Sequence, residues 1–268
     1  MNNSTALKFL QSTAALLLCL GLAACASKKL DKDLDDPAAK VEQVDTLKRA
    51  NLRMQLAVGY YQQGQHKVAL EEIRQALAAT PDLVDAYSLR ALIFMEMGDK
   101  HLAEENFQRA IQLSPNNADI LNNYAWFLCQ NGREKQGVGL FEKVLKDPAY
   151  PNPVKTLTNA GICSLKQGDN RAAEQFLTAA FRMDPGNILA SSNLAKVYFD
   201  KKDYENARFH VNRVLKAEVM TADVLWLAIK IEKKVGDEAA LASLTTQLRR
   251  RHPGSREFQL LQRGAFDE

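Results

Sequence analysis

Residues 84–117 read VDAYSLRALIFMEMGDKHLAEENFQRAIQLSPNN, and this stretch decides the fold. It contains a small residue at Ala91, a turn glycine at Gly98, a second small residue at Ala103 and a proline at Pro115. Small side chains at a helix crossing let two backbones approach closely, while Gly favours a turn and Pro ends a helix. The stretch therefore predicts a helical hairpin of 34 residues.

The same spacing recurs along the rest of the chain. Pro81 lies 34 residues before Pro115, Pro185 lies 70 residues after it, and Pro253 follows 68 residues later. The two extra residues fit an insertion in the proline-rich linker 148–153. Three further series share this period and this insertion: Gly64, Gly98, Gly132, Gly168 and Gly236; Ala57, Ala91, Ala125, Gly161 and Ala195; and Ala69, Ala103, Gly137, Ala173 and Ala207. Agreement between independent series predicts a repeat architecture.

The repeated unit resembles the tetratricopeptide repeat. Its consensus pattern is met by Tyr87, Ala91, Phe94, Ala103, Phe107, Ala110 and Pro115. The resemblance implies an all-α, superhelical solenoid of six helical hairpins, with units at 50–83, 84–117, 118–153, 154–187, 188–221 and 222–253. The fifth unit has Lys202 at the turn Gly and Val219 at the Pro, and the sixth has Leu241 where Ala is usual. Residues 254–268, with Phe258, Leu260 and Leu261, are expected to form a capping helix and tail.

The N-terminus has the pattern of a secretory signal. Residues 1–24 carry one charge, Lys8, followed by an apolar run of about ten residues, which is too short to anchor the chain in a bilayer. The run ends in LAAC at 22–25, which resembles a bacterial lipoprotein signal and implies cleavage before Cys25 and acylation of that thiol. An ordinary signal peptide with a chance Cys is the alternative. Ala26, where Asp would favour the inner membrane, points to the outer membrane facing the periplasm.

Residues 25–49 are expected to be the lipidated cysteine and a tether, because Lys and Asp dominate up to about Ala39 and leave little to bury. The whole chain has 268 residues, 46% hydrophobic and 25% charged, with a formal net charge of +3. This balance indicates a globular protein, and the charge is too small to indicate nucleic-acid binding.

Metal and enzyme chemistry are not indicated. His66, His101, His210 and His252 are spread over four predicted repeats without a pair at helical spacing, so we expect no metal site and no cofactor. No familiar catalytic motif occurs, and a solenoid offers little enclosed cavity, so we expect a protein that is not an enzyme.

The repeat resemblance implies that the first helix of each unit lines a concave groove. The apolar residues at inward positions are Met54, Val58, Tyr61, Leu92, Met95, Trp126, Ile162, Leu165, Phe199 and Trp226. Exposed apolar stripes of this kind usually mark partner binding. Alternatively, part of this set, especially Val58 and Ile162, packs between repeats.

Three asparagines occupy one inward position in successive units, at Asn123, Asn159 and Asn193. They resemble the asparagine rows by which some tetratricopeptide proteins hold a peptide backbone, since each amide offers a donor and an acceptor. Asn also occurs there as plain consensus. Cys129 and Cys163 fall on first helices of adjacent units, so either a disulfide in the oxidising periplasm or two separate buried thiols is compatible with the sequence.

A lipoprotein of six repeats with NNYAWFLC at 122–129 and NAGIC at 159–163 resembles the PilF/PilW family of type IV pilus biogenesis lipoproteins. That resemblance implies a pilotin, which binds the pilus secretin subunit and promotes its outer-membrane localisation and multimerisation, and hence twitching motility. The two cysteines match the pair of that family. An adaptor that docks periplasmic peptidoglycan hydrolases is the alternative, since such proteins use the same fold.

Overall fold

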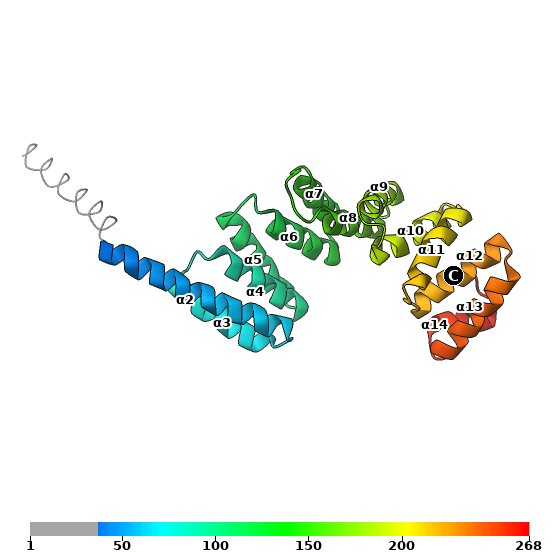
Figure 1. The fold of residues 1–268 in the computed structure, drawn as a ribbon, viewed down its shortest axis with the longest axis horizontal. Coiled ribbons are helices and arrows are strands. Elements are labelled where there is room, and N and C mark those ends of the chain that lie inside the picture. The colour runs from blue at the N-terminus through cyan, green and yellow to red at the C-terminus, as the bar shows by residue number, and fades with distance from the viewer. Residues whose placement is uncertain (1–36, 268) are drawn as a thin grey trace, which may run out of the picture. The chain divides into compact units, whose positions relative to one another are not determined.

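The computed structural model describes the backbone of residues 37–267 and the side chains from Val44 onward. The signal sequence, Cys25 and the first part of the tether lie outside the described residues. Within them the chain is entirely helical, and it divides into an N-terminal body that ends at Leu113 and a C-terminal body that begins at Ser114 (Figure 1).

The N-terminal body contains two helical hairpins and the C-terminal body contains four, followed by one further helix. In the N-terminal body the helices are α2 (Pro37–Gln62), α3 (His66–Ala79), α4 (Val84–Glu96) and α5 (Lys100–Leu113). In the C-terminal body they are α6 (Ala118–Gln130), α7 (Glu134–Leu145), α8 (Pro153–Gln167), α9 (Asn170–Met183), α10 (Ile188–Asp200), α11 (Tyr204–Lys216), α12 (Ala222–Val235), α13 (Glu238–Arg251) and α14 (Arg256–Arg263). The first and second helices of each hairpin pack on each other, which confirms the predicted fold class of six hairpins with a C-terminal helix.

The turns inside the hairpins need a left-handed residue. Gly168, for example, ends α8 with a φ of 82°, a conformation that costs glycine little because it lacks a Cβ. The fifth hairpin has Lys202 at the equivalent place, with a φ of 62°. The turn nevertheless closes, because the Lys202 N–H donates to the carbonyl of Phe199 at 2.9 Å and the Asp203 N–H donates to the carbonyl of Tyr198 at 2.9 Å.

Small residues lie where the helices of a hairpin are closest. A Cβ on Gly137 of α7 would lie 2.7 Å from the carbonyl oxygen of Ala125 on α6, so no larger residue fits without a backbone shift. A Cβ on Gly161 of α8 would lie 2.5 Å from Cγ of Leu177 on α9. The periodic small residues of the sequence are therefore the contact points of the helices.

The predicted boundary between the tether and the first repeat is wrong. Residues 37–49, assigned to the tether, form the first half of α2, which runs without interruption to Gln62. Pro37 suits the first turn of a helix, and residues 38–49 include Ala, Lys, Glu, Gln and Leu, all good helix formers, without Gly or Pro. α2 has 26 residues, whereas the first helices of the later hairpins have 13 to 15.

The C-terminal end of the array is capped. Leu260 of α14 is buried in one cluster with Leu244 and Leu248 of α13, and Phe258 and Leu261 pack against the same cluster. Such a cap covers apolar surface that the last repeat would otherwise expose. None of the described helices combines the length and the apolar character that a membrane span requires.

Candidate polypeptide-binding surface

In the C-terminal body, residues of successive first helices meet to form a common face. The Lys166 Nζ of α8 donates to Oε1 of Gln130 on α6 at 2.7 Å, and the Lys230 Nζ of α12 lies 5.3 Å from the ring centroid of Phe199 on α10. These contacts join the predicted inward positions of neighbouring repeats. We call this surface the inner face, and its members are Asn123, Trp126, Gln130, Lys155, Asn159, Ile162, Lys166, Leu189, Asn193, Lys196, Phe199 and Lys230.

A hollow of about 470 Å³ opens in the inner face between the N-terminal ends of α8 and α10. Its wall includes the proline linker, Lys155, Asn159 and Leu189, and more of its lining is apolar than polar. Leu189 is 53% exposed, which is unusual for a leucine in a well-packed repeat. The two-residue insertion therefore lies beside an open and largely apolar recess.

The floor of this hollow is held by hydrogen bonds. Asn187 is the N-cap of α10, and its Oδ1 accepts from the Ala190 N–H at 2.9 Å. The Asn187 Nδ2 donates to Oγ1 of Thr158 at 3.1 Å, and that hydroxyl donates to the carbonyl of Val154 at 2.8 Å. Because these polar groups are already satisfied, they fix the shape of the hollow and leave binding to the other side chains.

The three predicted asparagines differ in what they bond. The Asn193 Nδ2 donates to the carbonyl of Leu189 in its own helix at 2.8 Å, so this amide is partly engaged. Asn159 lines the hollow, and within the described residues its side-chain amide has no hydrogen-bond partner. Asn123 is half-buried and likewise unbonded within the described part of the chain. Asn159 is therefore the amide best placed to bond a peptide that enters the hollow.

The inner face also carries positive charge, which was not predicted from the sequence. Lys155, Lys166, Lys196 and Lys230 come from three successive first helices, and Lys155 lies at the hollow itself. Burial lowers the pKa of Lys230, while the carboxylates of Asp200 and Asp267 oppose this shift. The sequence holds this signal as lysines at inward repeat positions. A face of this composition suits a segment that combines apolar and acidic side chains.

The assignment of Trp226 to the open groove is wrong. Trp226 is only 5% exposed, because the C-terminal tail folds back from Gly264 and places Phe266 on the indole with 5.3 Å between ring centroids. The Lys233 Nζ lies 3.3 Å from the Phe266 ring centroid. The tail thus covers the inward position of the last repeat.

The remaining predicted groove residues of this body are all half-buried. They are Trp126, Ile162, Leu165 and Phe199. Trp126 packs against the cluster around Phe141, and Leu165 packs against the cluster around Leu194, so each presents only one edge to solvent.

The N-terminal body has a hollow of similar volume beside α2. Met54 and Val58 of α2 line a hollow of about 460 Å³ together with Asn51, Gln55 and Asp85. Met54 is only 8% exposed and belongs mainly to the core, which corrects its assignment as an open groove residue, whereas Val58 is 39% exposed.

Tyr61 is engaged by a neighbouring carboxylate. Its hydroxyl donates to Oε1 of Glu96, and burial together with this bond raises the pKa of Tyr61 to about 12. The His66 Nε2 lies 3.1 Å from the other oxygen of Glu96. Leu92 and Met95 on α4 are half-buried beside this cluster.

Cys129 of α6 and Cys163 of α8 form a disulfide, with 5.7 Å between their Cα atoms. Both cysteines are buried, and the bridge closes a loop of 34 residues between adjacent repeats. It ties together the two first helices that flank the hairpin partner α7. Across the described residues no three His, Cys, Asp or Glu side chains gather as metal ligands would.

The fold and its repeated contacts agree with comparisons to known proteins. The tetratricopeptide repeat family matches residues 54–99, 84–117, 106–138 and 164–227. The chain is therefore a tetratricopeptide-repeat protein, a class whose members mediate contacts between proteins.

Its relatives define the family more narrowly. The chain is 26% identical over 252 residues to the type IV pilus assembly protein PilF of Pseudomonas aeruginosa. This alignment covers 94% of this chain and 98% of the relative. The crystal structure of PilW, described as a widely conserved type IV pilus biogenesis factor, superposes on this chain with a TM-score of 0.73. The two sequences are 33% identical, and the match covers 79% of this chain and 97% of the PilW chain. The structure of Pseudomonas aeruginosa PilF superposes with a TM-score of 0.77, at 26% sequence identity, and the match covers 82% of this chain and 99% of the PilF chain. The chain belongs to the PilF/PilW family of tetratricopeptide-repeat proteins.

Proposed function

We propose that this protein is an outer-membrane lipoprotein that binds the type IV pilus secretin subunit and promotes its localisation and multimerisation in the outer membrane. Pilus biogenesis and twitching motility would follow from that activity. The observation that carries the proposal is the similarity to PilF and PilW, which spans nearly the whole length of those relatives. A match limited to shared repeats would support the fold alone.

The inner face supports a polypeptide as the partner. An apolar side chain of the secretin segment would enter the hollow beside Leu189, and its backbone would bond the Asn159 amide. An acidic side chain would lie near Lys155, which is exposed at the rim. These interactions are binding interactions, so the proposed role is that of a scaffold without a catalytic step.

Lipid attachment at Cys25 would place the scaffold at the outer membrane, facing the periplasm. Several acyl chains on one cysteine give durable anchoring, where a single chain binds only marginally. A Cys25→Ser variant should therefore move from the outer-membrane fraction to another fraction after cell disruption. Retention of that variant in the outer membrane would contradict the lipid anchor.

The activity is tested by deleting the gene and measuring detergent-resistant secretin multimers in isolated outer membranes. The wild-type gene and a Lys135→Glu control, which alters an exposed lysine on α7, should restore the multimers and twitching. A Lys155→Glu, Leu189→Glu double variant should restore neither, although both residues that it changes are exposed and the chain should still fold. Normal multimers after deletion would overturn the proposal, and loss of a peptidoglycan hydrolase from the membrane would then favour the adaptor role.

A further inference from the structure

One side of α2 is more exposed than the same side of the later first helices. The repeat spacing aligns Leu52 with Ala86, Ala190 and Val224. Those three residues are 0%, 0% and 6% exposed, whereas Leu52 is 58% exposed.

A second position on the same side of α2 repeats the difference. Leu56 aligns with Ala160, Leu194 and Ala228, which are fully buried, and with Arg90 and Tyr124, which are half-buried, whereas Leu56 is 41% exposed. Leu52 and Leu56 are four residues apart, so they lie on one side of the helix. We call this side, with Lys48 and Arg49 at its edge, the open face of α2.

The later repeats show what covers such a face. Val224 of α12 packs with Val211 and Val214 of α11, which is the second helix of the preceding hairpin. Likewise, Ala86 of α4 packs in one cluster with Ala76 of α3. In each case the cover is a helix that presents small or β-branched residues to the first helix of the next repeat.

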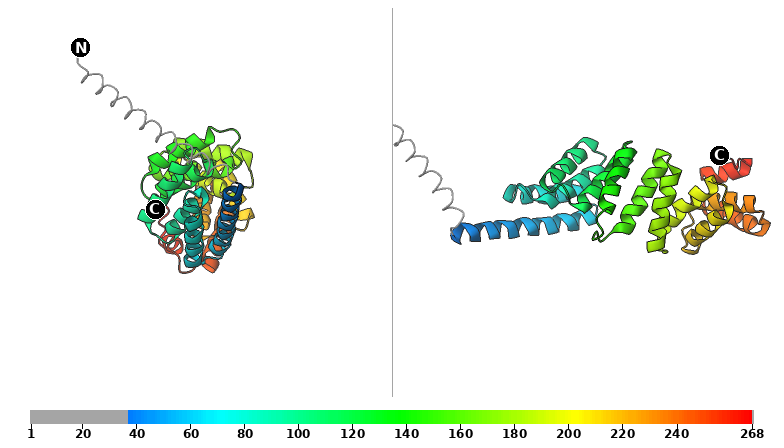
Figure 2. Two further views of the ribbon diagram at one scale, coloured as in Figure 1. Left: turned by 90° about the vertical axis from the view of Figure 1, so that its left-hand side faces the viewer. Right: turned by 90° about the horizontal axis from the view of Figure 1, so that it is seen from above.

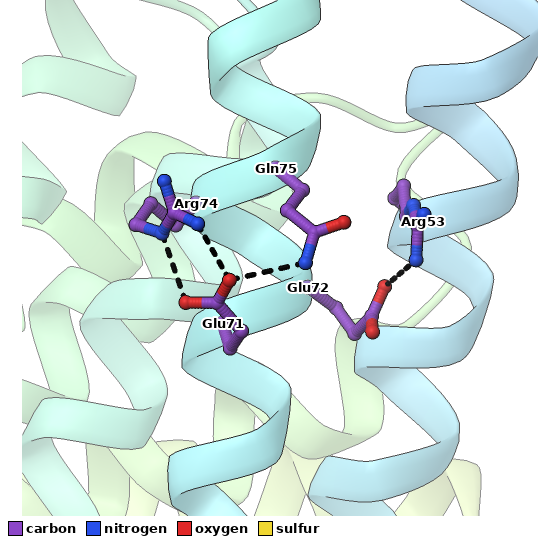
Figure 3. A network of polar contacts seen from close by, with 5 residues as sticks. All are labelled: Arg53, Glu71, Glu72, Arg74 and Gln75. Atoms are coloured by element: carbon purple, nitrogen blue, oxygen red, sulfur yellow. Dashed lines mark hydrogen bonds and ion pairs between the residues drawn. The ribbon is translucent and has the colours of Figure 1, made fainter.

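The described residues of the N-terminal body leave Leu52 and Leu56 exposed. Arg53 of α2 turns to α3, where its Nη1 donates to Oε2 of Glu72 at 2.9 Å (Figure 3). The first turns of α2 extend past the other helices of the N-terminal body, as Figure 2 shows. In the C-terminal body, by contrast, α14 packs on the last hairpin.

The edge of the open face carries exposed Lys48 and Arg49 together with exposed Asp45, which leaves a net positive charge. Lys48 lies 3.9 Å from Asp45, a weak contact between two exposed side chains, and Arg49 donates from Nη2 to the hydroxyl of Thr46 at 3.3 Å. The guanidinium of Arg49 is exposed and lies three residues before Leu52. An acidic side chain of an occupant would be attracted there, whereas a second copy of α2 would bring the same excess of positive charge.

We infer that the open face of α2 binds an amphipathic helix of a partner protein, which takes the place of the second helix of a preceding repeat. That helix runs antiparallel to α2, lays a stripe of small and aliphatic residues on Leu52 and Leu56, and carries an acidic residue opposite Arg49. This site is separate from the inner face, and the inference does not depend on the secretin role.

The test begins with photo-crosslinking of the full-length chain in its native cells. Benzoylphenylalanine in place of Leu52 is compared with benzoylphenylalanine in place of Met183, which is 57% exposed on α9. Mass spectrometry then identifies the crosslinked peptides. We expect position 52, but not position 183, to capture a segment of another protein with helical apolar periodicity and acidic residues.

The captured segment is then synthesised and mixed with the purified protein. We expect circular dichroism to show that the peptide gains helicity on binding. We expect Leu56→Glu and Arg49→Glu each to raise the dissociation constant of the peptide at least tenfold. Met183→Glu is the control and should leave binding unchanged. Because the substituted side chains are exposed, all variants should retain the wild-type thermal transition.

Four results would overturn the inference. They are crosslinks only to another copy of this chain, which would make the face a homodimer interface; crosslinks only to lipid; no crosslink above that of position 183; and a captured peptide that binds without becoming helical.

Discussion

Replacing Gly137 with Ala tests whether α6 and α7 approach as closely as the structure requires. The new Cβ would lie 2.7 Å from the carbonyl oxygen of Ala125, and 3.4 Å from both the backbone nitrogen of Cys129 and Sγ of Cys163. Since the nearest atom belongs to the backbone of α6 at the buried residue Ala125, it cannot move aside as a flexible side chain would.

The size of the effect follows from two opposing contributions. Ala is better than Gly inside a helix by about 1 kcal/mol. Overpacking a close contact costs about 1 to 3 kcal/mol, and a rigid backbone neighbour favours the upper end of that range. Gly137→Ala should therefore lower the free energy of unfolding by about 2 kcal/mol, which corresponds to a fall of roughly 5 °C in melting temperature for a body of this size.

Gly139 supplies a matched control on the same helix. A Cβ there has no atom within 4 Å, so Gly139→Ala should gain the helix preference alone and raise the free energy of unfolding by about 0.5 to 1 kcal/mol. Thermal and urea unfolding followed by circular dichroism measure both variants. Equal stabilisation by the two substitutions would refute the close approach and, with it, the packing assigned to the third repeat.

Three further predictions concern other sites in the C-terminal body. Reducing the Cys129–Cys163 bridge, or changing both residues to Ser, should lower the free energy of unfolding by about 3 to 4 kcal/mol, because the bridge closes a loop of 34 residues; unchanged urea midpoints would contradict this. Burial, and to a smaller extent the charge of Arg213, lowers the pKa of His210 to about 4, so the folded state disfavours protonation of this imidazole. The contribution of His210 to the free energy of unfolding is fully present above its unfolded-state pKa near 6.5. The free energy of unfolding should therefore fall by about 2 kcal/mol between pH 7 and pH 5. A His210→Phe variant should lack this fall when melting is measured as a function of pH. Lys202→Gly should raise the free energy of unfolding by about 0.5 to 1 kcal/mol, since Lys202 has a φ of 62°, and destabilisation would argue against that turn.

The repeat architecture could be predicted from the sequence because its signals are local and periodic. The small residues of the repeat, such as Gly137 and Gly161, lie at helix contacts with no room for a Cβ. The fifth hairpin forms although Lys202 replaces the turn glycine, because the packing of α10 on α11 outweighs the cost of one unfavourable backbone conformation. Periodicity summed over many positions is therefore more informative than any single substitution.

The site was less predictable, because it depends on segments that break the period. Trp226 occupies an inward position, but the tail that covers it through Phe266 lies outside the repeats. The hollow beside Lys155 and Leu189 lies next to the two-residue insertion, whose effect on the gap between helices has no signature in the sequence. The length of α2 was missed because charged residues such as Lys40 and Asp45 suit both a tether and an exposed helix.

The most direct test of the account is the affinity of the purified chain for the purified secretin subunit, measured by titration calorimetry. Wild-type protein and the Lys135→Glu control should bind equally, while Lys155→Glu combined with Asn159→Ala should bind at least tenfold more weakly at unchanged thermal stability. Equal binding by all three proteins would show that the inner face is not the surface through which this chain holds its partner.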